Sequence, residues 1–303
     1  MKKFLSMILA AMMLLSLTAC AEAPVMKVAS PAGAPGLALA TLAVQNPENY
    51  TFVAAETISA EFASAKADFI VAPINAGAKL FKMGKSTYQL AAVVSWGNLF
   101  FASQKEGFKV EDMNGAKVVL FGENTINASV VRYALEKNGI VPAEVEYLGS
   151  AANTQALLLS DAEAIVVTAE PALTASKMKN DKITAYAVND LYKTATGFEG
   201  YTQAGLFVKA ETAANQPEAV EAFLKLVEEA CLANAENIPA VAEAAVALEL
   251  LPNVKVATNA IPGCAVKYVN AWEAKEQVEQ TANVDLTQFG GAVPADAFYY
   301  GAK

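Results

Sequence analysis

The chain has 303 residues, more than one hydrophobic core usually organises, so we expect two domains. It carries 22 Lys and Arg against 31 Asp and Glu, and this acidic balance argues against nucleic acid or an anionic membrane surface as the partner. It contains no histidine and a single arginine, Arg132. This composition excludes histidine-dependent catalytic triads, histidine zinc sites and an arginine cluster around a phosphate.

The first twenty residues have the pattern of an export signal. Two lysines follow Met1, residues 4–17 are largely apolar, and the sequence Leu-Thr-Ala-Cys ends at Cys20. The apolar run is too short for a membrane span, and its ending resembles the bacterial lipobox, whose cysteine is lipid-modified. An ordinary signal peptide with an incidental cysteine is the alternative. We expect a signal peptide over residues 1–19, a lipidated tether over residues 20–24, and anchoring on the outer face of the cytoplasmic membrane.

Strands and helices alternate between Val25 and Ser103, which predicts a largely parallel sheet covered by helices. The expected strands are residues 25–29, 50–55, 68–73 and 88–94, and the expected helices are residues 37–44, 58–65 and 74–83. The turn after the first strand, residues 30–36, is rich in glycine and proline. Because a turn of this kind leads from a strand tip into a helix, it directs free backbone N–H groups at one point. We expect it to border a small-molecule site.

The same pattern repeats after a turn at residues 111–115. An extended apolar run, residues 99–103, precedes this repeat. The expected strands are residues 117–121, 145–148, 164–168 and 183–188, and the expected helices are residues 126–137, 153–159 and 172–179. Residues 201–208 form a further strand, and the rest is predicted to be helical, with helix starts near Pro217 and Pro239 and a helix over 265–280. The repeat predicts two similar α/β domains.

Two cysteines follow Cys20. Cys231 continues an apolar helical stripe, and Cys264 lies in a loop. In an exported protein they could form a disulfide, or Cys231 could be a small buried hydrophobic residue with Cys264 a separate thiol.

The order and spacing of these features resemble the solute-binding lipoproteins of bacterial ATP-binding-cassette (ABC) importers, in the branch that includes sulfonate-, nitrate- and thiamine-precursor-binding proteins. The resemblance covers essentially the whole chain after the signal. It is carried by the lipobox, the turn at residues 31–36, and the segments 68–75, 112–118, 203–208 and 290–300.

This resemblance implies an α/β fold of the type II periplasmic-binding-protein kind. Two similar α/β lobes would enclose a ligand cleft and be joined by two hinge crossings, near residues 99–104 and 200–208. Lobe 1 would comprise residues 25–100 and 207–303, and lobe 2 residues 101–206. Closure on a small-molecule solute would let a monomer dock on an ABC permease and its ATPase, with no chemistry and no cofactor. The alternatives are an enzyme on the same fold, such as a cofactor-precursor synthase or transferase, and a sensor-coupled or adhesive lipoprotein.

The resemblance implies that the solute contacts strand tips of both lobes. From lobe 1 we expect contacts from Ser30, Pro31, Gly33, Gly36, Asn75, Trp96 and Asn98. From lobe 2 we expect Glu123, Asn124, Thr125, Thr168 and Glu170, with Gln203 as a contact or a hinge residue. Four of them have a structural alternative: Trp96 could be a packed indole, Asn124 or Thr125 a helix cap, and Glu170 a surface acid.

The class of solute stays open on the sequence. Helix starts at the 31–36 and 123–126 turns favour a partly negative group such as a sulfonate or a carbonyl. Glu123 and Glu170, if they faced the cleft, would favour an amine instead. Sulfonates, pyrimidines, amines and peptide-like solutes therefore remain alternatives.

Overall fold

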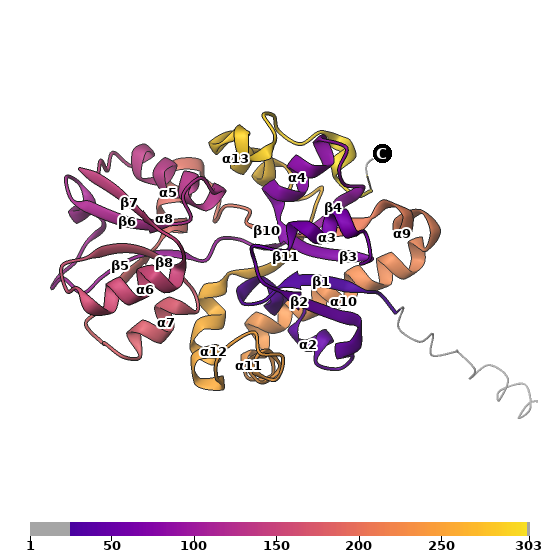
Figure 1. The fold of residues 1–303 in the computed structure, drawn as a ribbon, viewed down its shortest axis with the longest axis horizontal. Helices are drawn as coiled ribbons and strands as arrows, with labels where there is room; N and C mark the ends of the chain where they lie inside the picture. Colours follow the sequence, from indigo (N-terminus) through magenta and orange to yellow (C-terminus); the bar gives the residue numbers. More distant parts are fainter. Residues whose placement is uncertain (1–24, 302–303) are drawn as a thin grey trace, which may run out of the picture.

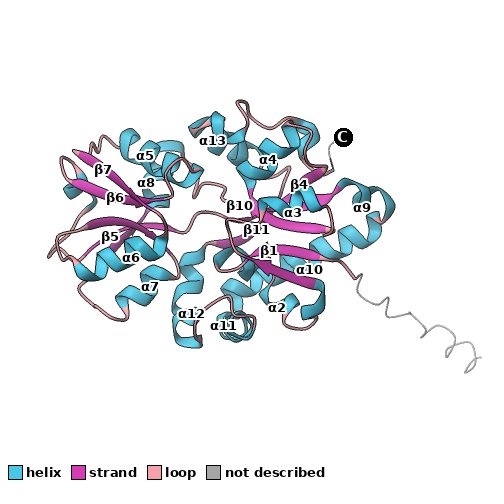
Figure 2. Ribbon diagram, viewed as in Figure 1, coloured by secondary structure: helices cyan, strands magenta, loops and turns pink. Residues whose placement is uncertain are grey.

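A computed structural model describes residues 25–301, which form two lobes lying side by side (Figure 1). The predicted signal peptide, Cys20 and its tether lie outside the described residues. Each lobe is built on its own sheet flanked by helices (Figure 2). None of the helices within residues 25–301 is long and apolar enough to cross a membrane.

The larger lobe, lobe 1, contains a six-stranded sheet in the order β11-β4-β10-β3-β1-β2. The strands are β1 (Val28–Pro31), β2 (Tyr50–Val53), β3 (Phe69–Pro73), β4 (Tyr88–Ser95), β10 (Ala204–Lys209) and β11 (Val266–Asn270). β1 is parallel to β2 and β3, whereas β10 is antiparallel to both β3 and β4. The sheet is mixed because β10 enters it from the side of the other lobe.

Helices cover both faces of this sheet. They are α2 (Ala40–Ala43), α3 (Ser59–Ser64), α4 (Ile74–Lys82), α9 (Ala210–Asn215), α10 (Pro217–Glu236), α11 (Ile238–Ala247), α12 (Val254–Ala260) and α13 (Lys275–Val284). Short 3-10 turns are η1 (Ala34–Ala38), η2 (Pro47–Asn49), η4 (Ile261–Cys264), η5 (Leu286–Phe289) and η6 (Asp296–Phe298). The longest helix, α10, buries the stripe that includes Phe223, whose ring lies 4.5 Å from that of Phe69 in β3.

The smaller lobe, lobe 2, contains a five-stranded sheet in the order β7-β6-β8-β5-β9. Its strands are β5 (Leu99–Ser103), β6 (Lys117–Phe121), β7 (Glu144–Leu148), β8 (Ile165–Ala169) and β9 (Thr184–Ala187). Its helices are α5 (Ile126–Lys137), α6 (Ala151–Ser160), α7 (Ala172–Lys177) and α8 (Val188–Thr196), with the 3-10 turn η3 (Val110–Met113). β6 is parallel to β7 and β8, and β5 is antiparallel to β8 and β9.

Two segments join the lobes. The first crossing, residues 96–98, leads from β4 to β5, and the second crossing, residues 197–203, leads from α8 to β10. The sequence-based lobe boundaries, at 100/101 and 206/207, fall inside β5 and β10, because each apolar run continues through the boundary as one strand. On sheet membership we assign residues 25–95 and 204–301 to lobe 1 and residues 99–196 to lobe 2.

The prediction of one helix over residues 265–280 is wrong in its first half. Residues 266–270 form β11, which pairs with β4 from Val266 opposite Ser95 to Asn270 opposite Ala92. The β-forming residues Val266, Tyr268 and Val269 explain this strand, and α13 begins only at Lys275. The expected helix 37–44 is divided into η1 and α2, and α8 follows β9 in a stretch for which no element was predicted.

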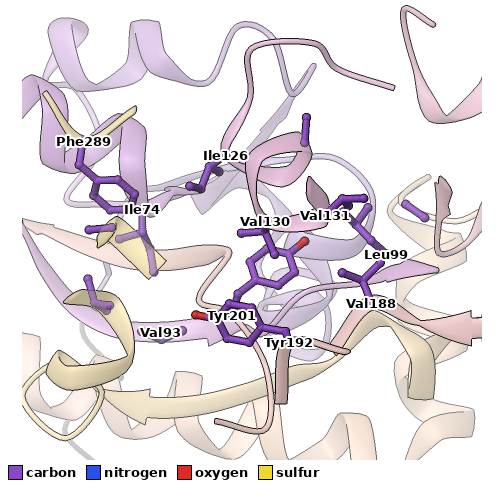
Figure 3. Close-up of a cluster of buried hydrophobic side chains, with 14 of the residues drawn as sticks. Ile74, Val93, Leu99, Ile126, Val130, Val131, Val188, Tyr192, Tyr201 and Phe289 are labelled. Carbon is purple, nitrogen blue, oxygen red and sulfur yellow. The ribbon is translucent and has the colours of Figure 1, made fainter. Parts of the chain in front are cut away.

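The hydrophobic core is continuous between the lobes. Figure 3 shows Ile74 and Val93 of lobe 1 and Val130 and Val188 of lobe 2 as members of one buried cluster. Between them lies Tyr201 of the second crossing, which is fully buried. The lobes are therefore packed against each other around the crossings as well as joined by them.

Both cysteines of the described residues are free and buried, so the disulfide alternative is not realised. Cys231 faces the carbonyl oxygen of Ala38, with the sulfur 3.9 Å from it. Cys264 is part of the apolar cluster around α11 and α12.

Candidate ligand-binding cavity

A cavity of about 320 Å³ lies between the lobes. Lobe 1 contributes the end of β1 and the turn after it, Ala55 beyond β2, the start of α4 and part of η5. Lobe 2 contributes the turn before α5 and the first residues of that helix, and the second crossing provides the base. The lining residues are Pro31, Ala32, Pro35, Ala55, Pro73, Asn75, Ala76, Asn124, Thr125, Ile126, Asn127, Gln203, Ala204 and Gln288. We call this space the interlobe cavity.

The turn after β1 presents small apolar groups to the interlobe cavity. Pro31 and Pro35 line it, whereas the buried Ser30 hydroxyl donates to the Pro31 carbonyl oxygen at 3.1 Å. Gly33 has φ +89°, a left-handed conformation that favours glycine. A Cβ on Gly36 would lie 3.1 Å from the Pro31 oxygen, so glycine lets η1 pack tightly below the turn. Ser30, Gly33 and Gly36 thus shape the turn.

The start of α4 supplies an amide side chain. Asn75 follows the first residue of the helix and lines the cavity, and its Oδ1 is buried without a hydrogen-bond donor among the described residues. The preceding Ile74 N–H donates to the Gln203 carbonyl oxygen at 3.1 Å. This bond fixes the start of α4 to the second crossing.

The turn before α5 is held by caps and by a contact from the other lobe. Thr125 is the N-cap: its hydroxyl accepts from the Ala128 N–H at 3.3 Å and donates to the Gly122 oxygen at 2.6 Å. Asn124 has φ +62°, and its carbonyl oxygen accepts from Nε2 of Gln288 in η5 at 2.9 Å. The capping alternative for Thr125 is therefore realised, although the residue also lines the cavity.

Among the described residues, no Asp, Glu, Lys or Arg and no aromatic ring lines the interlobe cavity. α4 and α5 both begin at the cavity, so the partly positive ends of two helices, one from each lobe, face it. Arg132 does not contribute, because its guanidinium donates to the hydroxyl groups of Tyr147 and Ser129. The interlobe cavity therefore has no charged side chain in its lining, and its polar lining residues are Asn75, Asn124, Thr125, Asn127, Gln203 and Gln288.

Five of the thirteen predicted site residues line the interlobe cavity, namely Pro31, Asn75, Asn124, Thr125 and Gln203. The structure does not bring Trp96, Asn98, Glu123, Thr168 or Glu170 to it. Glu123 is exposed outside the lining, and Thr168 is fully buried in β8, where its hydroxyl has no hydrogen-bond partner within residues 25–301.

Trp96 and Asn98 lie in the first crossing, where hydrogen bonds hold them to neighbouring segments. The Trp96 indole Nε1 donates to the Lys267 carbonyl oxygen at 2.9 Å, which ties the first crossing to β11. Asn98 accepts from Gln203 Nε2 at 3.1 Å and donates to the Glu170 carbonyl oxygen at 3.1 Å. The Ser95 hydroxyl completes this network by donating to Gln203 Oε1 at 3.1 Å. The network links both crossings to lobe 2.

The Glu170 carboxylate accepts hydrogen bonds from the first turn of α7. It accepts from the Thr174 N–H at 3.0 Å and from the Thr174 hydroxyl at 2.9 Å. The side chain is buried beside Gly263, where a Cβ would lie 2.9 Å from its Cγ. Burial raises the pKa of this carboxyl, and the Thr174 bonds act in the opposite direction. These bonds occupy both carboxylate oxygens. Glu170 is therefore a buried residue that caps α7, and it is not the surface acid of the structural alternative.

Two polar lining residues, Asn127 and Gln288, escaped the sequence reasoning. Asn127 is the second residue of α5, directly after the predicted helix start, and its Oδ1 accepts from the Tyr201 hydroxyl at 3.1 Å. The start of α5 was itself predicted, so its first turn could have been included. Gln288 comes from the C-terminal tail, and no local pattern indicates that η5 reaches lobe 2. Within residues 25–301 no group of carboxylates or cysteines is placed to hold a metal ion.

Two α/β lobes, joined by two crossings around a cavity, define the class of two-lobed periplasmic-binding-protein folds. A family model described as "NMT1/THI5 like" matches residues 36–239. The chain belongs to this family, and the expected two-lobed α/β fold is confirmed. No curated protein matches the sequence.

Solved structures share the fold at low sequence identity. An ABC transporter protein from Parabacteroides distasonis is 20% identical, with a TM-score of 0.79 over 92% of this chain and 100% of that one. The periplasmic aliphatic sulphonate-binding protein of Escherichia coli is 15% identical, with a TM-score of 0.70 over 92% of both chains. A putative nitrate transport protein from Thermoplasma volcanium is 10% identical, with a TM-score of 0.55 over 88% of this chain and 95% of that one.

Proposed function

We propose that this protein is the solute-binding component of an ABC importer and that it captures a small molecule in the interlobe cavity. The observation that carries the proposal is the composition of that cavity: neutral amide and small apolar side chains from both lobes meet at the starts of two helices. A volume of about 320 Å³ suits a small solute. The family membership and the solved importer proteins of the same fold support the same function.

The solute that fits this lining presents acceptor atoms, such as those of a sulfonate or a carbonyl group. Helix N-termini stabilise a full or partial negative charge, while a buried amine would lack a carboxylate partner among the lining residues. Glu123 and Glu170, which made an amine an alternative on the sequence, are not part of the lining. The protein binds and releases the solute unchanged, with the permease and its ATPase as partners of a monomer.

The proposal includes export and a lipid anchor on Cys20, which rest on the sequence pattern of residues 1–20. A Cys20→Ser variant should then leave the membrane fraction and appear in the soluble exported fraction. If the variant stays with membranes as the unchanged chain does, the anchor is elsewhere.

A thermal-shift screen tests the binding function. At about 100 times its Kd, a bound solute should raise the Tm by about 5–10 °C. We expect sulfonates and neutral carbonyl solutes to include the active compounds and alkylamines of the same size to be inactive. A solute that is turned over to product by the purified chain alone would contradict the proposal and favour an enzyme. An active amine would contradict the solute class while leaving the binding function intact.

A further inference from the structure

One side-chain amide in the wall of the interlobe cavity is oriented by a buried partner. Asn127, in the first turn of α5, lines the cavity, and its Oδ1 accepts from the Tyr201 hydroxyl at 3.1 Å. Its Nδ2 has no hydrogen-bond partner within residues 25–301, and it is not fully buried. The open end of this amide is therefore its N–H donor.

The Tyr201 hydroxyl determines which end of the amide is open. Tyr201 lies fully buried in the second crossing, and its ring centre is 6.0 Å from that of Tyr192 in the cluster between the lobes (Figure 3). Among the described residues, Asn127 Oδ1 is the acceptor for its hydroxyl proton. If the amide were reversed, the buried O–H would have no acceptor, which is unfavourable. The fold therefore holds Asn127 with its donor outward.

Tyr201 is itself held by the first crossing. A Cβ on Gly97 would overlap the Tyr201 ring, and Gly97 has φ +84°, so glycine lets the two crossings pack against each other. The ring has little room to move on this side. Its hydroxyl consequently stays directed at the start of α5.

The glutamine amides of the lining are committed differently. The Gln203 amide is used at both ends, since Oε1 accepts from the Ser95 hydroxyl and Nε2 donates to Asn98 Oδ1, each at 3.1 Å. Gln288 Nε2 donates to the Asn124 carbonyl oxygen at 2.9 Å, in a bond that is exposed to solvent. Neither glutamine has its N–H groups free for a solute.

The remaining polar groups of the lining lack a fixed donor. The Thr125 hydroxyl already donates to the Gly122 carbonyl oxygen at 2.6 Å. No hydrogen bond to a described residue orients the side-chain amide of Asn75 or of Asn124. Asn127 is therefore the lining residue that its surroundings commit to donating.

We propose that Asn127 selects the class of solute and that Tyr201 is its positioning residue. The solute places an acceptor, such as a sulfonate or carbonyl oxygen, against Asn127 Nδ2 at the partly positive start of α5. An amine meets this donor with N–H groups of its own and is rejected. This role rests on the proposed function, since it determines which solutes the interlobe cavity takes.

Titration calorimetry with butanesulfonate and butylamine tests this selection, because the two probes share a butyl chain and differ in head group. The unchanged chain should bind butanesulfonate at least about tenfold more tightly than butylamine. Asn127→Asp keeps an acceptor for Tyr201 and turns a carboxylate oxygen to the cavity, so the preference should reverse, each affinity changing at least about tenfold. The matched control is Asn153→Asp, which adds the same charge in the first turn of α6, outside the lining, and should keep the original preference.

Tyr201→Phe removes only the positioning hydroxyl. The Asn127 amide can then turn either end to the cavity, so the ratio of the two affinities should fall by about three- to tenfold. Tyr192→Phe is the matched control, because it also removes a buried hydroxyl, 3.4 Å from Thr281 Oγ1, and lies outside the lining. A merely structural role of Tyr201 would lower the Tm in the same way as Tyr192→Phe and leave the ratio unchanged.

Circular dichroism and the Tm establish that each variant is folded, and Asn127→Asp and Tyr201→Phe provide independent tests should one of them fail to fold. The role of Asn127 is overturned if the unchanged chain prefers butanesulfonate and folded Asn127→Asp keeps that preference, or if Asn153→Asp reverses it equally. An unchanged ratio in Tyr201→Phe overturns the positioning role. Binding of neither probe, or a preference of the unchanged chain for butylamine, would instead contradict the solute class of the proposed function and this role with it.

Discussion

At the scale of single residues, Thr125 combines a structural and a binding position. Its hydroxyl caps α5, and the residue also lines the interlobe cavity. Thr125→Ala should lower the free energy of unfolding by about 1 kcal/mol, because a buried helix start loses its cap. It should also weaken binding of any solute identified in the screen several-fold.

Ser150 provides the matched control for Thr125. It caps α6 in the same manner, accepting from the Asn153 N–H at 3.4 Å, but it is not part of the lining. Ser150→Ala should cost a similar free energy of unfolding and leave solute affinity unchanged. Urea denaturation and titration calorimetry measure the two quantities. If Thr125→Ala binds the solute as tightly as Ser150→Ala does, the start of α5 does not contact the solute.

Buried tyrosine and cysteine side chains make the fold sensitive to alkali. Burial raises the pKa of Tyr192 to about 12 and that of the Cys231 thiol to about 12. Because these folded-state values exceed those of the unfolded chain, the stabilisation they represent is complete below about pH 9. It is lost as the pH rises from about 9 towards 12. The free energy of unfolding should therefore be insensitive to these groups near neutrality and fall across that window.

Urea midpoints measured at several pH values test this alkaline window. Ultraviolet absorbance of tyrosinate reports ionisation of the tyrosines, and a thiol reagent should modify Cys231 only after unfolding. Rapid modification of Cys231 in the folded chain at pH 8 would contradict the burial that the structure gives it.

At the scale of elements, β10 is tightly packed in the middle of the lobe 1 sheet. It lies between β3 and β4, and a Cβ on Gly205 would be 2.3 Å from Cδ1 of Leu90 and 3.1 Å from the Ala92 oxygen. Gly205→Ala should lower the free energy of unfolding by about 1–3 kcal/mol through overpacking. Gly149→Ala is the control, because its Cβ would meet only Asn153 Oδ1 at 3.5 Å. An unchanged urea midpoint for Gly205→Ala would contradict the packing described for β10.

The sequence predicts most elements and misses those that depend on distant partners. Alternating strands and helices, the turn at residues 30–36 and the start of α5 all follow from local patterns. β11 does not, because helix-forming residues follow it closely and its strand character depends on pairing with β4. The contact of η5 with Asn124 is likewise a tertiary event across 164 residues of sequence separation.

The same distinction applies to the candidate site. Pro31, Asn75 and Asn124 occupy element ends and line the interlobe cavity, so they stay candidate solute contacts. Trp96 and Glu170 also lie at strand ends. However, the Trp96 indole donates to a carbonyl oxygen of β11, and the Glu170 carboxylate accepts from the first turn of α7. A position at the end of a strand identifies a candidate contact residue. Whether its side chain faces the cavity depends on the hydrogen-bond partners that neighbouring elements offer it.

At the scale of the whole molecule, the lobes meet through a small number of specific bonds beside the cavity. The Ser129 hydroxyl donates to Asp285 Oδ2 at 2.8 Å, and Gln288 donates to Asn124. Both bonds join α5 or its preceding turn to the segment after α13. A solute between these surfaces gains contacts from both lobes only when they are apposed, which is how its binding energy would favour the closed state.

The most direct test of the account is titration calorimetry of a screened solute against the chain and two matched variants. Ala76 lines the interlobe cavity, whereas Ala63 is exposed on α3 and outside the lining. We predict one binding site per chain, an affinity reduced at least about 100-fold in Ala76→Phe because the ring occupies the solute's space, and unchanged affinity in Ala63→Phe. Undiminished binding by a folded Ala76→Phe variant would show that the solute binds elsewhere and would contradict the central claim.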